Sequence, residues 1–489
     1  MAQMTQANQP VQISVIPGLQ ADDLLLERFV ATERFSQPFE VVVEAISPDK
    51  VIDFQPHLGK GVGIRVKTGD PLVDRFFHGV LYEALTIDTD GRTTRYRLTL
   101  RPWLSLLDLG MNTRIFQKMS VQDIIKKVFA DANFSAYSMQ MSTAGSKPRE
   151  YCVQFRESDF HFVSRLMEEE GIYYYFAHAE DGHKMMLCEK PGDHPGFPGS
   201  TAQVMRHGKG AGLGPHVDGW ERRLKPSIIK ATLFDAHFQK TTTTLQADAP
   251  EVSKNPAEAA EHYDFPGGFG YFKDDGSEVG TPYAQARLLE RRADRETYLG
   301  HGDVFAFPVG QKVKVKDAAT TTELLVVSAT HTMSGQNYMI TDATEGTVQF
   351  GISFEGVPAA TQWKAPSVTR KPLAGGPQVA KVVGASGEVI DVDQFGRVKI
   401  QFPWDRVGTN DENSSCWVRV SQGWADGGFG QIMIPRIGEE VVVDFLDGDP
   451  DRPIITGRVY NSALKVPYPL PANKTRSTWK SQTVGDLGA

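Results

Sequence analysis

The sequence has few cysteines and lacks any long apolar run. Its three cysteines, Cys152, Cys188 and Cys416, are far apart among 489 residues and form no CxxC pair. This spacing argues against a disulfide framework and favours folding in a reducing compartment. No apolar stretch approaches the roughly 20 residues that span a bilayer. The N-terminal segment MAQMTQANQPVQISV has neither the basic region nor the apolar core of a signal peptide. Export of this protein would therefore depend on something other than a cleaved leader.

The C-terminal part lacks the positive charge balance that nucleic-acid binding needs. The whole chain has a net charge of −8, and residues 383–464 carry 13 acidic and 7 basic side chains. A surface with this balance repels phosphate, so the release of counterions cannot drive binding to nucleic acid. The last 25 residues reverse the sign, because Lys465, Lys474, Arg476 and Lys480 stand against Asp486.

Motifs for hydrolytic or metal chemistry are also missing. The sequence has no GxSxG, and Glu168, Glu169 and Glu170 are adjacent on a predicted helix, so their carboxylates cannot all converge on one pocket. We interpret this run as an ion-paired or solvated face. Five histidines lie near Cys188 without HxxxH or HExxH spacing, so we expect surface histidines rather than a zinc site. They are His178, His183, His194, His207 and His216.

The glycine-rich segments Gly375–Gly376 and Gly427–Gly430 are not phosphate loops, because no Lys-Ser/Thr pair follows them and no helix opens there. We therefore predict no catalytic, cofactor-binding or metal-ligating residue, no cofactor, and a protein that is not an enzyme.

The patterns that are present predict a mainly β, multi-domain fold. A chain of 489 residues is long enough for about three domains, and its 46 glycines and 29 prolines favour a turn-rich fold. Residues 11–110 read as short strands. In one of them Tyr96, Leu98 and Leu100 alternate with arginines, which indicates a half-buried strand.

Three helices interrupt the strands. Ser120 is a good N-cap for a helix with an apolar stripe formed by Ile124, Ile125, Val128 and Phe129. A second helix is predicted from Ser158 to Gly171, burying Phe160, Val163, Leu166 and Met167, and the strand IYYYF follows it. Residues 178–220 are predicted to loop over the surface. A third helix is predicted from Pro282 to about Tyr298, with Thr281 as its cap.

More strands follow, in DVFAFPV (303–309), QKVKV, ELLVVSATHTM and TVQFGISFEGV. The stretch 365–378 is rich in Pro, Gly and Lys and indicates a linker. Beyond it, about 80 residues with five or six strands have the size of a small closed β-barrel such as the OB-fold. Its predicted strands include GEVIDVD (387–393), GRVKIQFPWD and PIITGRVYN.

The segment 387–461 closely resembles the OB-fold domain of the VgrG family, the spike proteins of type VI secretion systems. GRVKIQFPWDR, SSCWVRV, IPRIGEEV and GDPDRPIITGRVYN carry the resemblance. Upstream, VQFRESDFHFVSRLMEEEGIYYYF, HYDFPGGF and ELLVVSATHT resemble the family's N-terminal part, which is related to the hub of contractile phage tails.

The resemblance implies a hub of β-barrels with helical insertions at 1–375, a linker at 376–382 and an OB-fold at 383–464. Residues 465–489 would then be a linker and the first turns of a trimeric β-helix needle. The needle is otherwise absent, which fits either a shortened form or a blunt natural member. One chain cannot close such a needle, so we expect a homotrimer, held by its hub contacts. The basic tail is interpreted as charge spread around the needle base rather than as a membrane patch.

The family's partners are the Hcp tube hexamer, sheath and baseplate proteins, a PAAR-type tip protein and effectors, with only transient contact with a target membrane. Assembly is expected in the cytoplasm, followed by secretion through the type VI apparatus without a signal peptide. Nucleic-acid binding through Phe395, Phe402, Trp404, Trp417 and Trp424 is disfavoured by the acidic balance, and core or subunit-contact roles are favoured.

Two alternatives stay open. One is a hub–spike protein of a contractile phage tail or bacteriocin. The other is a delivered toxin, if the native chain has a C-terminal enzymatic extension.

Overall fold

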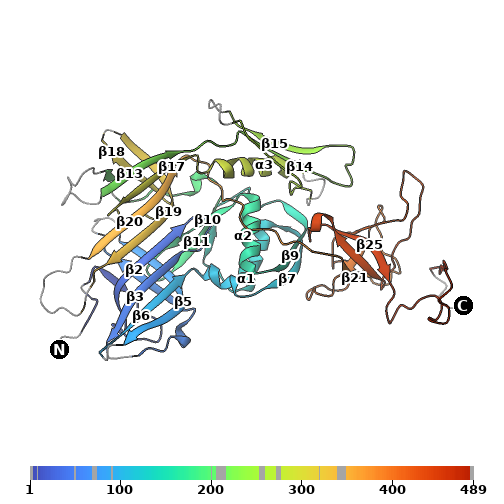
Figure 1. Cartoon of the computed structure of the whole chain (residues 1–489), viewed down its shortest axis with the longest axis horizontal. Coiled ribbons are helices and arrows are strands. Elements are labelled where there is room, and N and C mark those ends of the chain that lie inside the picture. The colour runs from blue at the N-terminus through green and yellow to red at the C-terminus, as the bar shows by residue number, and fades with distance from the viewer. Residues whose placement is uncertain are drawn as a thin grey trace.

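The computed structural model describes residues 4–7, 9–48, 51–68, 74–89, 92–199, 201–204, 216–252, 259–270, 277–318, 320–336, 338 and 348–484. The protein is mainly β, as the sequence predicted. Figure 1 shows an elongated molecule with a large sheet at one end, helices in the middle and the last strands at the other end. In the described part of the chain, no helix is both long enough and apolar enough for a membrane span.

Among the described residues, twelve strands form one continuous sheet in the order β1-β4-β5-β6-β3-β2-β19-β18-β12-β13-β17-β20. We call these strands the two-barrel region. Their bounds are β1 (Val11–Ile13), β2 (Leu25–Arg34), β3 (Glu40–Pro48), β4 (Gly61–Val66), β5 (Arg75–Thr89), β6 (Thr93–Arg101), β12 (Ala202–Val204), β13 (His216–Leu224), β17 (Glu296–Gly302), β18 (Lys312–Asp317), β19 (Thr320–Ser334) and β20 (Gln349–Pro358). β19 also pairs with β20, so the last six strands close on themselves, and the β2–β19 ladder joins them to the first six.

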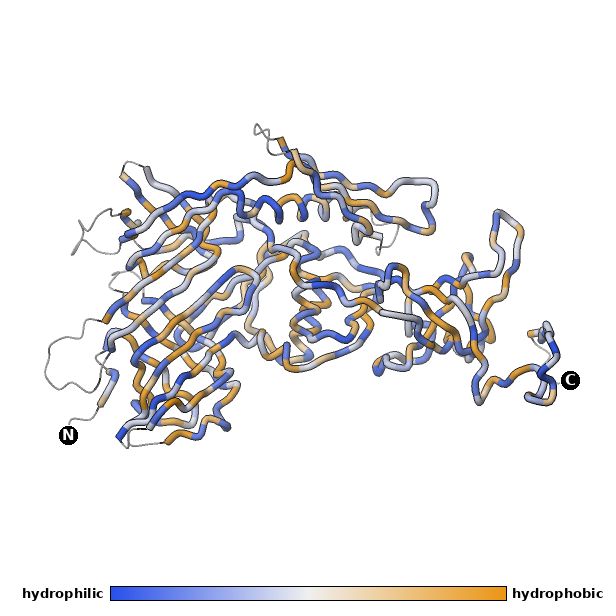
Figure 2. Tube along the Cα trace, in the orientation of Figure 1, coloured by the Kyte–Doolittle hydropathy of each residue, from blue (hydrophilic) through white to orange (hydrophobic). Residues whose placement is uncertain are grey.

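Alternation of apolar and polar residues explains this sheet (Figure 2). On β6, Tyr96, Leu98 and Leu100 are fully buried, as predicted. Arg97, between Tyr96 and Leu98, points outward and pairs with Glu44 of β3 at 3.0 Å. A period of two residues therefore separates a core face from an ion-paired outer face.

A buried amide bridges the seam of the first six strands, where β1 and β2 lie together without pairing. The Nε2 of Gln336 donates to the carbonyl oxygens of Val11 in β1 and Leu26 in β2, at 3.0 and 2.9 Å. One side chain thus satisfies a backbone acceptor on each side of the seam, where an unpaired carbonyl would be costly.

Two helices, α1 (Val121–Asp131) and α2 (Asp159–Glu170), lie between the two-barrel region and the C-terminal strands (Figure 1). Their caps are those that the sequence predicted. The Ser120 and Ser158 hydroxyls accept hydrogen bonds from the backbone N–H groups of Asp123 and His161, respectively. Gly171 ends α2 in the left-handed conformation, at a φ of 68°. The strands beside them are β7 (Asn112–Ser120), β8 (Tyr137–Met139), β9 (Pro148–Glu157), β10 (Tyr173–His178) and β11 (His183–Cys188).

An insertion between β13 and β17 forms a separate small layer. It consists of β14 (Lys230–Asp235), β15 (Leu245–Pro250), β16 (Glu261–Asp264) and α3 (Ser277–Arg292). The predicted start and end of this helix, Pro282 and Tyr298, are wrong, because Pro282 lies inside α3 and Tyr298 lies in β17. The buried side chains of Val279 and Tyr283 hold the helix on the sheet on both sides of the proline.

The C-terminal barrel consists of β21 (Gln378–Val383), β22 (Lys399–Gln401), β23 (Arg419–Val420), β24 (Glu440–Phe445) and β25 (Pro453–Val459), in the order β22-β21-β24-β25-β23. Val398 and Val418 exchange both backbone hydrogen bonds, at 3.0 and 2.8 Å, and so close the barrel that the sequence predicted. β21 takes up most of the stretch expected as a linker, 376–382, so that expectation is corrected there.

Three other predictions are wrong. DVFAFPV (303–309) is not a strand, because its backbone turns at 305–306 and again at 309, although its apolar side chains are buried. GEVIDVD (387–393) has no ladder partner and exposes both of its valines, Val389 and Val392. Residues 178–220 are not only loop, since they include β11, β12 and the start of β13, while 205–215 lie outside the described residues. Phe160 is only partly buried, whereas the other predicted apolar positions of α2 are buried.

Candidate functional site: the junction between α2, β9 and the C-terminal barrel

The Glu168–Glu170 run is ion-paired and hydrogen-bonded, and each carboxylate goes to a different place. Glu168 accepts the backbone amides of Val368 and Thr369 at 2.9 and 2.8 Å and so ties α2 to the segment that leads to the C-terminal barrel. Glu169 and Glu170 each pair at 2.8 Å with the buried guanidinium of Arg149 on β9. The three groups therefore join elements together and do not converge on one pocket.

Arg149 is the centre of this network. It is 1% exposed, and it also donates to the Tyr283 hydroxyl of α3 at 3.0 Å. Burial opposes ionisation of Glu169, but the charges of Arg149 and Arg165 outweigh it and lower the pKa of this carboxyl to about 2. β9, α2 and α3 are thereby held by charges that meet at a guanidinium with little access to water.

A second set of charges attaches the C-terminal barrel. The Lys371 ammonium lies 2.8 Å from the Asp449 carboxylate and 2.6 Å from that of Asp451. Asp451 in turn accepts the backbone amide of Val153 in β9 at 2.6 Å, a contact between residues 298 positions apart. The sequence did not indicate this contact, because no motif or periodicity relates the segment around Val153 to the segment around Asp451.

The junction also has an apolar core. Tyr151, Val153 and Phe155 of β9 are buried in one cluster with Val382, Ile400 and other side chains of the C-terminal barrel. Burial raises the pKa of Cys152 on β9 and of Cys416 in the barrel to about 12 in each case. Both thiols are therefore held protonated and are poor nucleophiles.

The histidines that cluster in the sequence do not gather at one place, because His178 and His183 lie side by side on β10 and β11 while His194 and His216 lie elsewhere. His194 bonds the Tyr173 hydroxyl at 2.9 Å, and His216 lies beside Asp218 and Asp303. His207 lies outside the described residues. Within the described ranges, no group of three or more His, Cys, Asp or Glu side chains is arranged to hold a metal ion. The expectation that these are surface histidines is wrong for His183 and His194, which are buried, and for His178, whose ring is enclosed 2.9 Å from the Glu33 carboxylate.

His183 instead belongs to a buried polar group that the sequence did not indicate. Its Nε2 accepts the backbone amide of Trp103 at 3.0 Å, so its Nδ1 carries the proton and faces His78 Nδ1 at 2.9 Å. Desolvation, together with His178 and His78, lowers the pKa of His183 to about 2. The ring therefore stays neutral at physiological pH.

The aromatic residues of the C-terminal barrel divide into core and surface. Phe402 stacks on Trp404 with centroids 4.8 Å apart and lies in the core shared with β9. Phe395 and Trp424 are exposed by 48% and 61%, and Trp424 packs only edge-on against Phe429 across the Gly427–Gly430 turn. Among the described tail residues, Arg476 and Lys480 lie over the Tyr468 ring.

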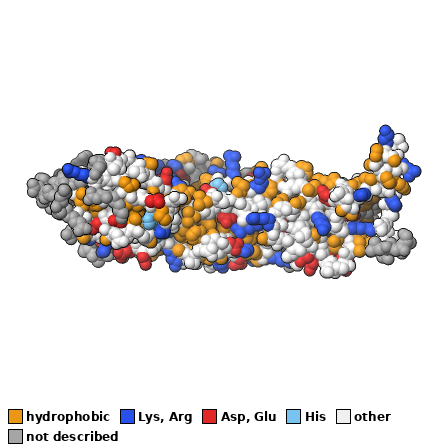
Figure 3. Space-filling model, turned by 90° about the horizontal axis from the view of Figure 1, so that it is seen from below, with side chains coloured by type: hydrophobic (Ala, Val, Ile, Leu, Met, Phe, Trp, Pro, Cys, Tyr) orange, Lys and Arg blue, Asp and Glu red, His pale blue; other side chains and the backbone are white. Residues whose placement is uncertain are grey.

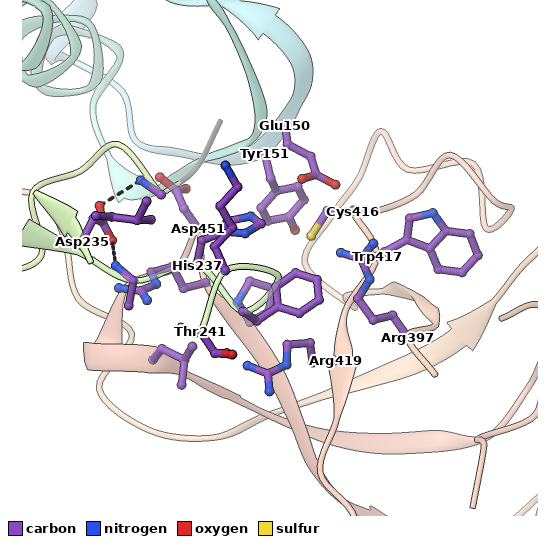
Figure 4. Close-up of a pocket in the computed structure, with 18 of the residues that line it drawn as sticks. Glu150, Tyr151, Asp235, His237, Thr241, Arg397, Cys416, Trp417, Arg419 and Asp451 are labelled. Carbon is purple, nitrogen blue, oxygen red and sulfur yellow. Dashed lines mark hydrogen bonds between the residues drawn. The ribbon is translucent and has the colours of Figure 1, made fainter. Parts of the chain in front are cut away.

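A cavity of about 510 Å³ opens beside the junction. It is lined by the loop that joins β14 to β15, by β9 and by the C-terminal barrel (Figure 4). Three parts of the chain more than 80 residues apart build it, so no local pattern could have indicated it. It holds basic and acidic side chains, threonines and one buried tyrosine.

Comparisons with known proteins match both parts of the chain. Residues 32–338 match the family described as phage tail baseplate hub (GPD). Residues 381–460 match the family described as type VI secretion system/phage-baseplate injector OB domain. The expected OB-fold and hub-like architecture are thus confirmed.

Curated relatives cover nearly the whole chain. The type VI secretion system spike protein VgrG1b of Pseudomonas aeruginosa is 37% identical over 98% of this chain and 64% of its own length. VgrG1a of the same organism is 37% identical over 94% of this chain and 71% of its own length. The actin cross-linking toxin VgrG1 of Vibrio cholerae is 33% identical over 96% of this chain but only 43% of its own length. The chain thus spans less than two thirds of the length of several relatives.

Solved structures show the same fold. An E. coli component of the type VI secretion system, described as similar to the T4 tail proteins gp27 and gp5, aligns with a TM-score of 0.64 at 18% identity. The alignment covers 92% of this chain and 99% of that one. A Francisella PdpA–VgrG complex aligns with a TM-score of 0.58 at 9% identity, over 93% of this chain and 78% of that one.

Proposed function

Since this chain belongs to the VgrG family of type VI secretion system spike proteins, we propose that three copies of it form the rigid base of a spike. Sheath contraction would drive this base, with the tube behind it, toward a target membrane. The observation that carries the proposal is the junction, where charges and a shared apolar core fix the C-terminal barrel to the hub. A part that transmits force along its length needs such a connection rather than a free hinge.

Exposed apolar side chains support a homotrimer. Many of the exposed large hydrophobic residues lie on the C-terminal barrel and the segment after it. Among them are Trp424, Ile432 and Trp479, which are 61%, 74% and 80% exposed. Figure 3 shows hydrophobic side chains on the projecting segment at that end. Exposed apolar patches of this kind mark interaction sites, and a second and third copy around one axis would cover them.

The two-barrel region supports docking on a six-fold ring. Its sheet divides at the β2–β19 ladder into two sets of six strands. Three copies would therefore present six such sets around the axis, which matches the symmetry of a hexameric tube. We propose the Hcp hexamer as the partner on this face, with sheath and baseplate proteins around it and a PAAR-type tip protein and effectors at the other end.

The remaining assignments follow from the same proposal. The hub would occupy 1–375, the OB-fold 383–464 and the base of a β-helix needle 465–489. Assembly would take place in the cytoplasm and release would proceed through the apparatus. The likeness to phage tail baseplate proteins favours, as a second candidate, the hub–spike of a contractile phage tail. The toxin VgrG1 of Vibrio cholerae shows that relatives can carry further activities beyond the matched part.

Electron microscopy of the purified chain mixed with purified Hcp rings tests this function. We expect particles in which three copies share one axis and stack on one end of the hexamer. Single chains bound to the side of the ring, or rings without any stacked density, would contradict the proposal. A variant in which Trp424 and Ile432 are both changed to Asp should give fewer stacked particles, because charge at these two positions opposes the packing of three barrels around one axis and weakens the trimer.

A further inference from the structure

The cavity beside the junction has no role in the spike proposed above, and its size suits a ligand. Its volume of about 510 Å³ lies within the range of roughly 300–1,000 Å³ that is typical of small-molecule and peptide pockets. Figure 4 shows Glu150 and Tyr151 at one end of it and Arg419 with Thr241 at the other. The two ends of the cavity therefore differ in the charge of the side chains that line them.

The end at Arg419 is cationic. The Arg419 guanidinium lies 5.2 Å from the centre of the Phe238 ring; the side chain is exposed, and among the described residues no carboxylate pairs with it. Arg397 stacks on the same ring at 4.9 Å and is held there by Asp393 at 2.7 Å. Phe238 thus fixes two guanidinium groups side by side, one of which still lacks an anion.

The end at Tyr151 holds an unsatisfied donor. Tyr151 is 3% exposed, and its hydroxyl has no hydrogen-bond partner among the residues that the structure describes. Burial, with the nearby Cys416 and Asp451, raises the pKa of this phenol well above its usual value, so the hydroxyl remains a donor. A buried donor without an acceptor is costly to leave in place. The half-buried Glu150 carboxylate next to it makes no hydrogen bond or ion pair within the described part of the chain, and its charge acts on His237 and Lys399 only through space.

The other acidic side chains of the cavity are already used. Asp235 accepts the backbone amides of Phe269 and Gly270 at 2.9 and 2.8 Å. Asp451 is occupied by Lys371 and the amide of Val153. Glu150 is therefore the acidic group that remains for a ligand, and it lies away from the cationic end (Figure 4).

We propose that this cavity binds an extended peptide segment of a separate polypeptide, with an acidic side chain at Arg419. A peptide unit has both an acceptor, its carbonyl oxygen, and a donor, its N–H. It can therefore satisfy the Tyr151 hydroxyl and the Glu150 carboxylate together, which a simple anion cannot do. The threonine hydroxyls of the β14–β15 loop, among them Thr241, add further donors along the path. This assignment does not depend on the proposed function, because one chain supplies every group named.

Fluorescence anisotropy with three labelled, C-amidated tetrapeptides tests the assignment. One contains two glutamates, the second has glutamine in their place and the third has lysine. We expect the glutamate peptide to bind and the other two to bind at least about tenfold more weakly, the factor that a lost charged hydrogen bond produces. Arg419→Gln should weaken the glutamate peptide by a similar factor. Arg222→Gln, which changes an exposed arginine remote from the cavity lining, is the matched control and should leave its affinity unchanged.

Tyr151→Phe separates a binding role from a structural one. The wild-type hydroxyl is unsatisfied, so its removal should leave the unfolding temperature unchanged or raise it, while peptide affinity falls severalfold. Equal affinity for the three peptides, no binding by the wild-type protein, or an Arg419→Gln variant that binds normally would each overturn the assignment. If dilute single chains bind the peptide but the assembled oligomer does not, a neighbouring copy fills the cavity. This outcome would also overturn the assignment. The mass of the protein in solution, measured in parallel, tests the proposed trimer separately.

Discussion

Replacing Arg149 with methionine removes the guanidinium that holds β9, α2 and α3 together. The side chain is 1% exposed and pairs at 2.8 Å with both Glu169 and Glu170, whose side chains are 31% and 7% exposed. Removing one partner of a buried pair leaves an uncompensated charge and costs about 3–5 kcal/mol. We take about 3 kcal/mol as the expected loss, because Glu169 retains Arg165 at 3.5 Å and has partial access to water.

Amide hydrogen exchange followed by mass spectrometry measures this loss where it arises. A local loss of about 3 kcal/mol should speed exchange in peptides from α2 and β9 by roughly a hundredfold. Exchange in the closed barrel of β12, β13 and β17 to β20 should change little. The assay reports local opening, so it does not require the whole chain to unfold in one step.

The matched control is Arg222→Met, which breaks an exposed pair. Arg222 and Glu296 lie 2.9 Å apart with side chains 55% and 32% exposed, and solvent screens such pairs so that they contribute little to stability. Its effect on exchange should therefore stay below about fivefold. If Arg149→Met and Arg222→Met gave the same small effect, the reasoning that burial makes the Arg149 network strong would be refuted.

Three further predictions follow from other parts of the molecule. Burial and nearby positive charge lower the pKa of His183 to about 2 and of His331 to about 3. Both rings are neutral in the fold but take up protons below about pH 6.5 when unfolded. The free energy of unfolding should therefore keep its full value above pH 6.5. Below that pH it should fall by up to about 1.4 kcal/mol per histidine per pH unit. Equal unfolding temperatures at pH 7.5 and 5.5 would contradict this. Changing both Trp424 and Ile432 to Asp should weaken self-association at least tenfold in sedimentation experiments, because two exposed apolar contacts become charged; unchanged association would show that this face is not a subunit contact. Deleting 465–489 should leave the oligomer intact in the same experiment, since the hub contacts are expected to hold it, and dissociation to single chains would assign that role to the tail.

Local signals in the sequence gave correct predictions where a single element decides the structure. Ser120 and Ser158 cap their helices as expected, and Gly171 ends α2, because a cap depends on residues within one turn. The closed C-terminal barrel was also predicted, since its strands follow one another with turns between them. The two backbone hydrogen bonds that close it, between Val398 and Val418, join residues of the barrel itself.

The predictions failed where distant packing decides the structure. α3 continues through Pro282 because Val279 and Tyr283 are buried on the insertion sheet, and this burial offsets the lost backbone hydrogen bond. The cavity and the Lys371–Asp451–Val153 contact were missed for a related reason. Their groups come from segments that are far apart in the chain, 298 residues in the case of Val153 and Asp451, and no periodicity or motif connects them.

The central claim is that three copies of this chain share one axis, and the mass of the purified protein in solution tests it most directly. Light scattering coupled to size-exclusion chromatography should give a species of about three times the 54.0 kDa of one chain, unchanged on dilution through the micromolar range. A species of 54.0 kDa at micromolar concentration would contradict the account.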